Sequence, residues 1–94
     1  MGTGIRKTRP AVIVSNDSCN RLGARVVVVP MTSNVDSLYP GEAMVEVQGR
    51  AARALGDQIR SLDRRRLKAR IGTLTPVGMA NIDEAVAVTL GLQR

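Results

Sequence analysis

Two short runs of β-branched residues constrain the fold of this chain most strongly. Residues 11–14 read Ala-Val-Ile-Val and residues 26–29 read Val-Val-Val-Val, and polar or turn-forming residues close each run. β-Branched side chains favour extended backbone, and a run without polar alternation is typical of a strand that is buried on both faces. The sequence therefore predicts strands over 11–15 and 25–29, both inside a closed or covered sheet.

Further short strands and loops are expected along the rest of the chain. Residues 33–41 are rich in Asn, Asp, Ser, Pro and Gly, which predicts an exposed loop. A turn is expected at 20–23, and a helical turn at 64–66 with Leu62 and Leu67 facing inward. Strand signals of differing strength follow at 43–47, 51–55, 58–61 and 71–74.

Residues 76–90 carry the clearest helix signature. Thr75 is a good N-cap residue, Pro76 suits the first helical position, and Gly91 suits the position just past the end. An apolar stripe recurs at helical spacing and is expected to pack on the sheet. Its members are Met79, Ile82, Val86 and Leu90.

These elements predict one domain of the α+β class, mainly β, over residues 1–94. Residues 1–8 are expected to be a short irregular N-terminus, and 76–90 the C-terminal helix. The expected architecture is a small barrel or a strongly curved antiparallel sheet with the helix packed on it.

The charge balance favours a polyanionic partner. Twelve Arg and two Lys face eight carboxylates, which gives a net charge of +6. Arginine binds phosphate oxygens in pairs, so this bias favours nucleic acid, although a merely solvated basic surface is the plainer alternative. Tyr39 is the only aromatic residue, which argues against base stacking on an aromatic platform.

The residue types that this sequence lacks limit the metal sites and reactions it can support. The chain has one cysteine and no histidine, which excludes a disulfide framework, the usual zinc sites and a histidine acid–base pair. We therefore expect no metal and no cofactor, with any catalysis resting on Arg, Thr, Ser or carboxylates. No run approaches the roughly 20 apolar residues of a membrane span, and no signal peptide is expected, so the predicted location is the cytoplasm.

Polar groups at the ends of the predicted strands form a candidate site. Arg9 precedes the first run, Thr32 follows the second, and the segment around Gln58 and Arg60 offers an amide and a second guanidinium. Strands of one sheet can bring such groups to a single rim. Guanidinium, hydroxyl and amide groups together suit a phosphate, and on a basic chain they point to RNA.

The same motifs resemble those of the MazF/PemK/Kid toxins, in the same order and over about residues 9–92. They are Arg9-Pro-Ala-Val-Ile-Val-Ser-Asn16-Asp17, Val-Val-Pro30-Met-Thr32-Ser33-Asn34, Asp57-Gln58-Ile59-Arg60-Ser-Leu-Asp63-Arg-Arg-Arg-Leu67, Ile71-Gly72-Thr-Leu-Thr-Pro76 and Leu90-Gly91-Leu92. The resemblance implies an SH3-like β-barrel with a C-terminal helix, working as a homodimer. It also implies a metal-independent endoribonuclease that cuts single-stranded mRNA and is held inactive by a cognate antitoxin protein.

The resemblance assigns roles to six residues. Arg9 matches the family's arginine and Thr32 its threonine, so both are expected to be catalytic: Arg9 stabilises charge on the phosphate and Thr32 donates a hydrogen bond to it. The residues expected to contact RNA are Asn16, Ser33, Gln58 and Arg60. Taken singly, each of these residues also suits an ordinary strand entry, turn or wet strand face.

One departure from the family pattern keeps alternatives open. Relatives begin with a strand of the type Arg-Gly-Asp/Glu-Ile-Trp and a Glu-bearing loop, whereas eight residues precede Arg9 here. We expect this strand and most of the loop to be lacking, which would leave an unpaired sheet edge. An upstream gene start, a partner that supplies the edge, and a degenerate toxin all explain this.

The sequence is therefore compatible with two functions other than RNA cleavage. A catalytically impaired relative would bind RNA or antitoxin without cleaving. A CcdB-like toxin would target DNA gyrase, but that family ends in Trp-Gly-Ile, and this chain ends Leu92-Gln93-Arg94 without a tryptophan.

Overall fold

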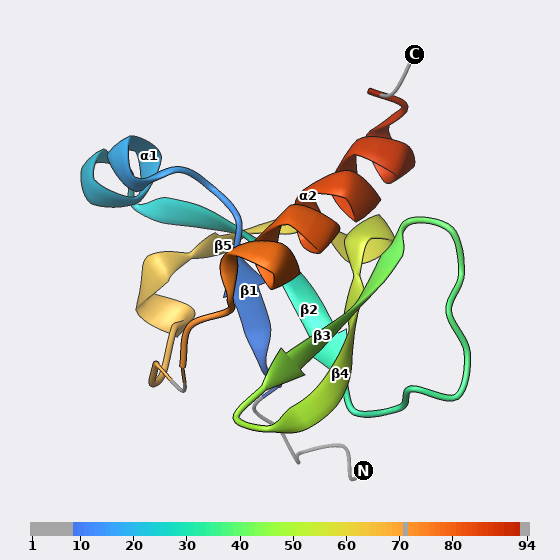
Figure 1. Ribbon diagram of the computed structural model, residues 1–94. Coiled ribbons are helices and arrows are strands. Elements are labelled where there is room, and N and C mark those ends of the chain that lie inside the picture. Colours follow the sequence, from blue (N-terminus) through green and yellow to red (C-terminus); the bar gives the residue numbers. More distant parts are fainter. Residues whose placement is uncertain (1–8, 71, 93–94) are drawn as a thin grey trace, which may run out of the picture.

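A strongly curved antiparallel sheet with one long helix across it makes up the molecule (Figure 1). The computed structural model describes residues 9–70 and 72–92. The predicted mainly-β class and curved sheet with a C-terminal helix are confirmed. The strands and α-helices are β1 (Ala11–Ile13), α1 (Asp17–Leu22), β2 (Arg25–Thr32), β3 (Glu42–Val47), β4 (Arg50–Leu55), β5 (Arg60–Asp63) and α2 (Pro76–Leu90), with 3₁₀ turns η1 (Gly56–Gln58) and η2 (Arg64–Arg66).

β2 is the centre of the sheet. On one side it pairs with β1, Ala11 lying opposite Pro30. On the other side it pairs first with β5 and then with β4, while β3 pairs with β4. Among the described residues, β1 pairs with β2 alone and β3 with β4 alone, so each has an edge with no strand partner there.

A proline inside the central strand is explained by an interruption in its neighbour. The pairing of β2 with β5 ends at Val28 opposite Arg60, and the pairing with β4 resumes at Met31 opposite Ala54. The register shifts by three residues between the two, which accommodates η1. Pro30 lies in this gap, where the strand needs no N–H donor.

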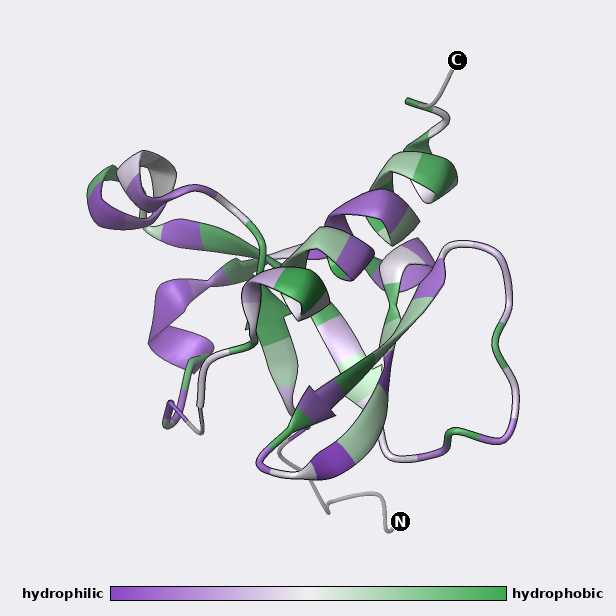
Figure 2. Ribbon diagram, viewed as in Figure 1, coloured by the Kyte–Doolittle hydropathy of each residue, from purple (hydrophilic) through white to green (hydrophobic). Residues whose placement is uncertain are grey.

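The core lies between the sheet and α2. Ile82 is fully buried at the centre of the helix and packs with alternate residues of four strands, so one face of the sheet is covered by α2 (Figure 2). The buried cluster is Val12, Val29, Met31, Ala43, Val45, Ala54, Ile82 and Ala85. Gly56 permits the closest approach here, since a Cβ on it would lie 2.3 Å from the Gly41 carbonyl oxygen.

The two β-branched runs differ in burial. In β2, Val26, Val28, Val29, Pro30 and Met31 are all buried, as the continuous run predicts. In β1, Val12 is buried but Ile13 is 39% exposed. The prediction of two covered faces is therefore wrong for the first run, because the side of β1 that carries Ile13 is only partly covered.

One turn prediction and one strand prediction need correction. Residues 17–22 form α1 rather than a simple turn at 20–23, since the Asn20 N–H donates to the Asn16 carbonyl at 2.9 Å and Asp17 lies in the first turn. The predicted strand at 71–74 is wrong over 72–74, which have no regular structure and lead directly to the cap of α2. Ile71 and the predicted irregular N-terminus 1–8 lie outside the described residues.

The predicted helical turn at 64–66 is confirmed as η2, which Asp63 caps by accepting from the Arg65 N–H. Leu62 is half-buried as expected, but Leu67 is 40% exposed and does not face inward. The chain leaves the sheet at η2, so Leu67 has no sheet face to pack on.

α2 begins and ends as its sequence predicts. The Thr75 hydroxyl accepts from the Gly78 N–H at 3.0 Å, Pro76 is the first helical residue, and Gly91 ends the helix in the left-handed conformation. Met79, Ile82 and Val86 reach the core. Leu90 does not and is 53% exposed, because the last turn runs past the sheet (Figure 1).

Candidate functional site

The register of β1 and β2 brings Arg9 and Thr32 to facing positions. Ala11 lies opposite Pro30, and the Met31 N–H donates to the Pro10 carbonyl at 3.0 Å, so the ladder continues one residue past β1. One further step in the same register would place Arg9 opposite Thr32. Facing residues of an antiparallel pair project to the same side, with Cβ atoms about 4.5–5.5 Å apart.

This pair lies on the face of the sheet away from α2. Val29 and Met31 point into the core under the helix, and side chains alternate along a strand, so Thr32 points to the other side. Arg9 is exposed and Thr32 is half-buried. Both groups are therefore accessible to a ligand at this end of the sheet.

The hydroxyl of Thr32 is held by its own loop. Its oxygen accepts from the Asn34 N–H at 3.2 Å, and the Asn34 side chain in turn accepts from the Asp36 N–H at 3.1 Å. Because the oxygen serves as an acceptor within the chain, the hydroxyl hydrogen can be donated outward, as contact with a phosphate oxygen requires.

A second arginine, which the sequence analysis did not single out, flanks Thr32 on its other side. Arg53 of β4 is the direct register partner of Thr32. Its guanidinium NH1 donates to the carbonyl and the hydroxyl of Ser37, both at 2.8 Å, and its Nε lies 3.6 Å from a carboxylate oxygen of Glu42. Thr32 is thus the middle member of a row with an arginine on each side.

The other predicted RNA contacts lie at differing distances from this row. Ser33 follows Thr32 directly and is exposed. Gln58 is exposed in η1, beside the gap in the β2 ladder, and Arg60 faces Val28 on the same side of the sheet as Thr32. Val28 and Thr32 are four residues apart, or roughly 13 Å along a strand.

Asn16 is not brought to the row. It lies at the other end of β1 from Arg9, next to α1, roughly 20 Å away for an extended segment of this length. The structure of one chain therefore places Arg9 and Thr32 at the same end of the sheet with Ser33 next in the chain, places Arg60 and Gln58 further away, and leaves Asn16 apart.

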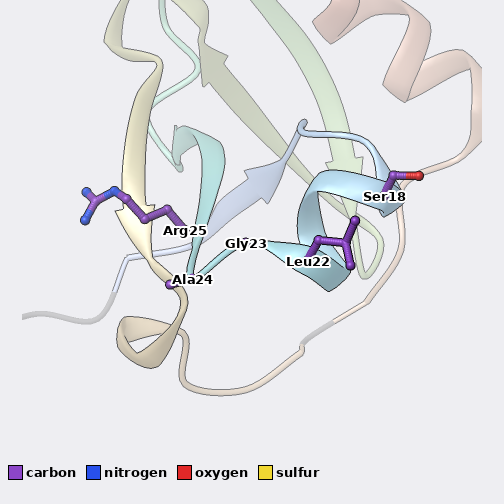
Figure 3. A pocket seen from close by; sticks show the side chains of 5 residues that line it. All are labelled: Ser18, Leu22, Gly23, Ala24 and Arg25. Carbon is purple, nitrogen blue, oxygen red and sulfur yellow. The ribbon is translucent and has the colours of Figure 1, made fainter.

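A shallow hollow lies elsewhere on the surface. It has a volume of about 590 Å³ and opens between α1 and the first residues of β2 (Figure 3). Ser18, Leu22, Gly23, Ala24 and Arg25 line it. Arg25 is the first residue of β2 and Thr32 the last, so the hollow is at the opposite end of the strand from the candidate site.

The described residues offer no alternative centre of metal chemistry. They contain no group of three or more His, Cys, Asp or Glu side chains arranged to hold a metal ion. They also contain no helix long and apolar enough to cross a membrane.

Comparison with known proteins decides the family. Residues 1–90 match the family described as the PemK-like, MazF-like toxin of type II toxin–antitoxin systems. The chain belongs to this MazF/PemK toxin family. The resemblance read from the ordered motifs is thereby confirmed.

MazF-family proteins from mycobacteria are similar over almost the whole chain. Endoribonuclease MazF9 of Mycobacterium tuberculosis is 37% identical over 100 residues, covering 97% of this chain and 85% of that protein. A solved endoribonuclease from a mycobacterial species superimposes with a TM-score of 0.82 at 31% identity, over 92% of this chain and 83% of the other. A second, in complex with its cognate antitoxin, gives 0.80 at 33% identity, over 92% and 84%.

Proposed function

We propose that this MazF-family toxin is an endoribonuclease that cleaves single-stranded mRNA without a metal ion, with Arg9 and Thr32 as its catalytic residues. The observation that carries the proposal is the β1–β2 register, which, extended by one step beyond the Pro10–Met31 hydrogen bond, places Arg9 opposite Thr32 at the end of the sheet. Similar mycobacterial proteins are named endoribonucleases, which supports the reaction type.

In the proposed reaction the RNA supplies its own nucleophile. The 2′-oxygen loses its proton and bonds to the adjacent phosphorus, the bond from phosphorus to the 5′-oxygen breaks, and that oxygen takes up a proton. The products are a 2′,3′-cyclic phosphate and a 5′-hydroxyl. Arg9 stays protonated and stabilises negative charge on the phosphorane through paired hydrogen bonds, and Thr32 donates its hydroxyl hydrogen to the same phosphate.

We assign RNA binding to residues next to this pair and further along the same face. Ser33 contacts the nucleotide at the cleaved bond, while Gln58 and Arg60 contact a neighbouring base edge and phosphate. Amide side chains suit base edges and guanidinium groups suit phosphates. Asn16 is assigned to a more distant nucleotide, since about 20 Å separates it from Arg9 along the chain.

The proposed partners follow from the family. A MazF-type toxin belongs to a toxin–antitoxin pair, and one similar protein has been solved with its cognate antitoxin. We propose that this chain binds an antitoxin as well, that it works as a homodimer, and that it acts in the cytoplasm, where its mRNA substrate is found.

Cleavage in the presence of EDTA tests the proposal. The parent protein is expected to cut single-stranded RNA and to leave cyclic phosphate ends, because no step uses a metal. Arg9→Ala and Thr32→Val are each expected to slow cleavage by about 100-fold while the circular dichroism spectrum stays unchanged. An Arg65→Ala variant, at the other end of the molecule, is the control and should cut at the parent rate. Binding without any cleavage by the parent would instead favour the impaired relative.

A further inference from the structure

Segment 33–41 is anchored although it has no regular structure. It begins at Thr32, whose oxygen accepts from the Asn34 N–H. It ends at β3, where the Tyr39 N–H donates to the Glu42 carboxylate at 3.0 Å and the Tyr39 carbonyl accepts from the Glu42 N–H at 3.0 Å. Gly41 lies against Thr89 of α2.

Arg53 joins these anchors to the sheet. Its NH1 holds both acceptors of Ser37 in the middle of the segment, and its Nε faces Glu42, which holds Tyr39. The guanidinium therefore fixes the segment directly at Ser37 and lies within ion-pair distance of Glu42, which holds Tyr39. It does so from the residue directly opposite Thr32.

The Arg53–Glu42 side of this contact is largely withdrawn from water, whereas the hydrogen bonds to Ser37 are exposed. The side chains of Arg53 and Glu42 are 13% and 8% exposed, and Arg53 Nε is buried without a hydrogen-bond partner in the described structure. A lysine has one nitrogen and no fork, so it cannot reach Ser37 and Glu42 in the same way. The geometry calls for arginine and not merely for positive charge.

We propose that Arg53 is a positioning residue for RNA cleavage: by fixing segment 33–41 it holds the Asn34 N–H on the Thr32 oxygen and so keeps the Thr32 hydroxyl aimed at the substrate. This inference rests on the proposed nuclease function. It adds a residue that acts through Thr32 and Ser33 and that needs no contact with RNA.

Tyr39 makes the test direct. It is the only aromatic residue in the chain and lies in the segment, so intrinsic tyrosine fluorescence anisotropy reports the mobility of this segment without a label. Four variants are compared with the parent protein. They are Arg53→Met, Arg53→Lys, Ser37→Ala, and Arg50→Met as a control on an exposed arginine of the same strand.

We expect Arg53→Met and Arg53→Lys to lower the anisotropy and to lower kcat about tenfold with KM nearly unchanged, because a misplaced hydroxyl weakens transition-state contacts more than binding. Ser37→Ala, which removes one of the two acceptors of NH1, should give a smaller change in the same direction. Arg50→Met should match the parent in both measurements.

Three outcomes would overturn the proposal. The first is unchanged anisotropy in both Arg53 variants, and the second is lower anisotropy with an unchanged kcat. The third is a fully active Arg53→Lys, which would assign the effect to charge. A parent protein that cuts no RNA would instead overturn the proposed function and with it the role in cleavage, and the anisotropy alone would then decide whether Arg53 holds the segment.

Discussion

Two arginine–carboxylate pairs at opposite ends of the sheet differ in burial. At the β2–β4 end, Arg53 and Glu42 are 13% and 8% exposed. At the β5–η2 end, Arg65 donates to both carboxylate oxygens of Asp63 at 3.2 and 3.0 Å, with side chains 88% and 28% exposed. The shorter, better aligned pair is the one in water.

Burial decides which pair is important. An exposed pair gains little because water screens it and solvates each partner equally well when they separate. A buried pair has given up its hydration, so removing one partner leaves a charge with neither water nor a counter-ion. The Arg53 pair also holds segment 33–41, which follows Thr32, whereas the Arg65 pair caps a single turn.

The largest effect on stability is expected at the buried pair. Arg53→Met should lower the free energy of unfolding by about 3 kcal/mol, because Glu42 is left unpaired and Ser37 loses its donor. Urea denaturation measures this. Adding Glu42→Gln to the same chain should restore part of the loss, since it removes the unpaired charge. A loss below about 1 kcal/mol for Arg53→Met would place this pair in the same class as the exposed one.

A smaller loss of stability is expected at Gly56, which lets Gly41 at the end of segment 33–41 lie close to η1. A Cβ on Gly56 would lie 2.3 Å from the Gly41 carbonyl oxygen, and that atom is backbone. Gly56→Ala should therefore cost about 2 kcal/mol in urea denaturation. Gly72→Ala is the matched control, because its new Cβ would meet only the Gln48 side chain at 3.9 Å. Equal losses in the two variants would show that the close approach has no energetic weight.

Loss of the exposed Arg65–Asp63 pair should have almost no effect on stability. Arg65→Met is expected to leave the free energy of unfolding almost unchanged, because both partners of the salt bridge remain solvated. The same urea measurement applies. A loss as large as that of Arg53→Met would show that burial does not decide how much each pair stabilises the fold.

The smallest effect is a pH dependence at the same exposed pair. Hydrogen bonds from the Arg65 guanidinium, then from its backbone N–H, hold the pKa of Asp63 below its usual 3.8. A lowered folded-state pKa gives stability that is present above the unfolded value and is lost as the pH falls through the folded one. Asp63→Asn should therefore flatten slightly the fall in urea midpoint below about pH 4. An unchanged slope would show that the pair contributes nothing even there.

The sequence predicted the elements whose determinants are local. Thr75, Pro76 and Gly91 set the ends of α2 through their own capping and backbone preferences. The run of valines predicted β2. The exposed Leu67 and the irregular segment 72–74 depended instead on where the chain leaves the sheet. An apolar residue or a short strand signal says nothing about whether a partner lies beside it.

The residues of the candidate site also differ in whether a local sequence signal points to them. Arg9 and Thr32 were predicted from ordered motifs, and the extended register of β1 and β2 is consistent with their lying opposite each other, while their catalytic role stays a prediction. Arg53, the proposed positioning residue, was not predicted because it stands among alanines in a weak strand signal, and its partners Ser37 and Glu42 are 16 and 11 residues away. The lone arginine in Ala51-Ala52-Arg53-Ala54 was the available signal.

The most direct test of the account is whether Arg9 and Thr32 act on one phosphate. The measurement is a double-mutant cycle on the single-turnover cleavage rate with Arg9→Ala, Thr32→Val and the combined variant. Two groups that hold the same phosphorane are coupled, so the combined variant should be far faster than the product of the two single losses predicts. Losses that simply multiply would mean that the two side chains act independently, and the central claim would be wrong.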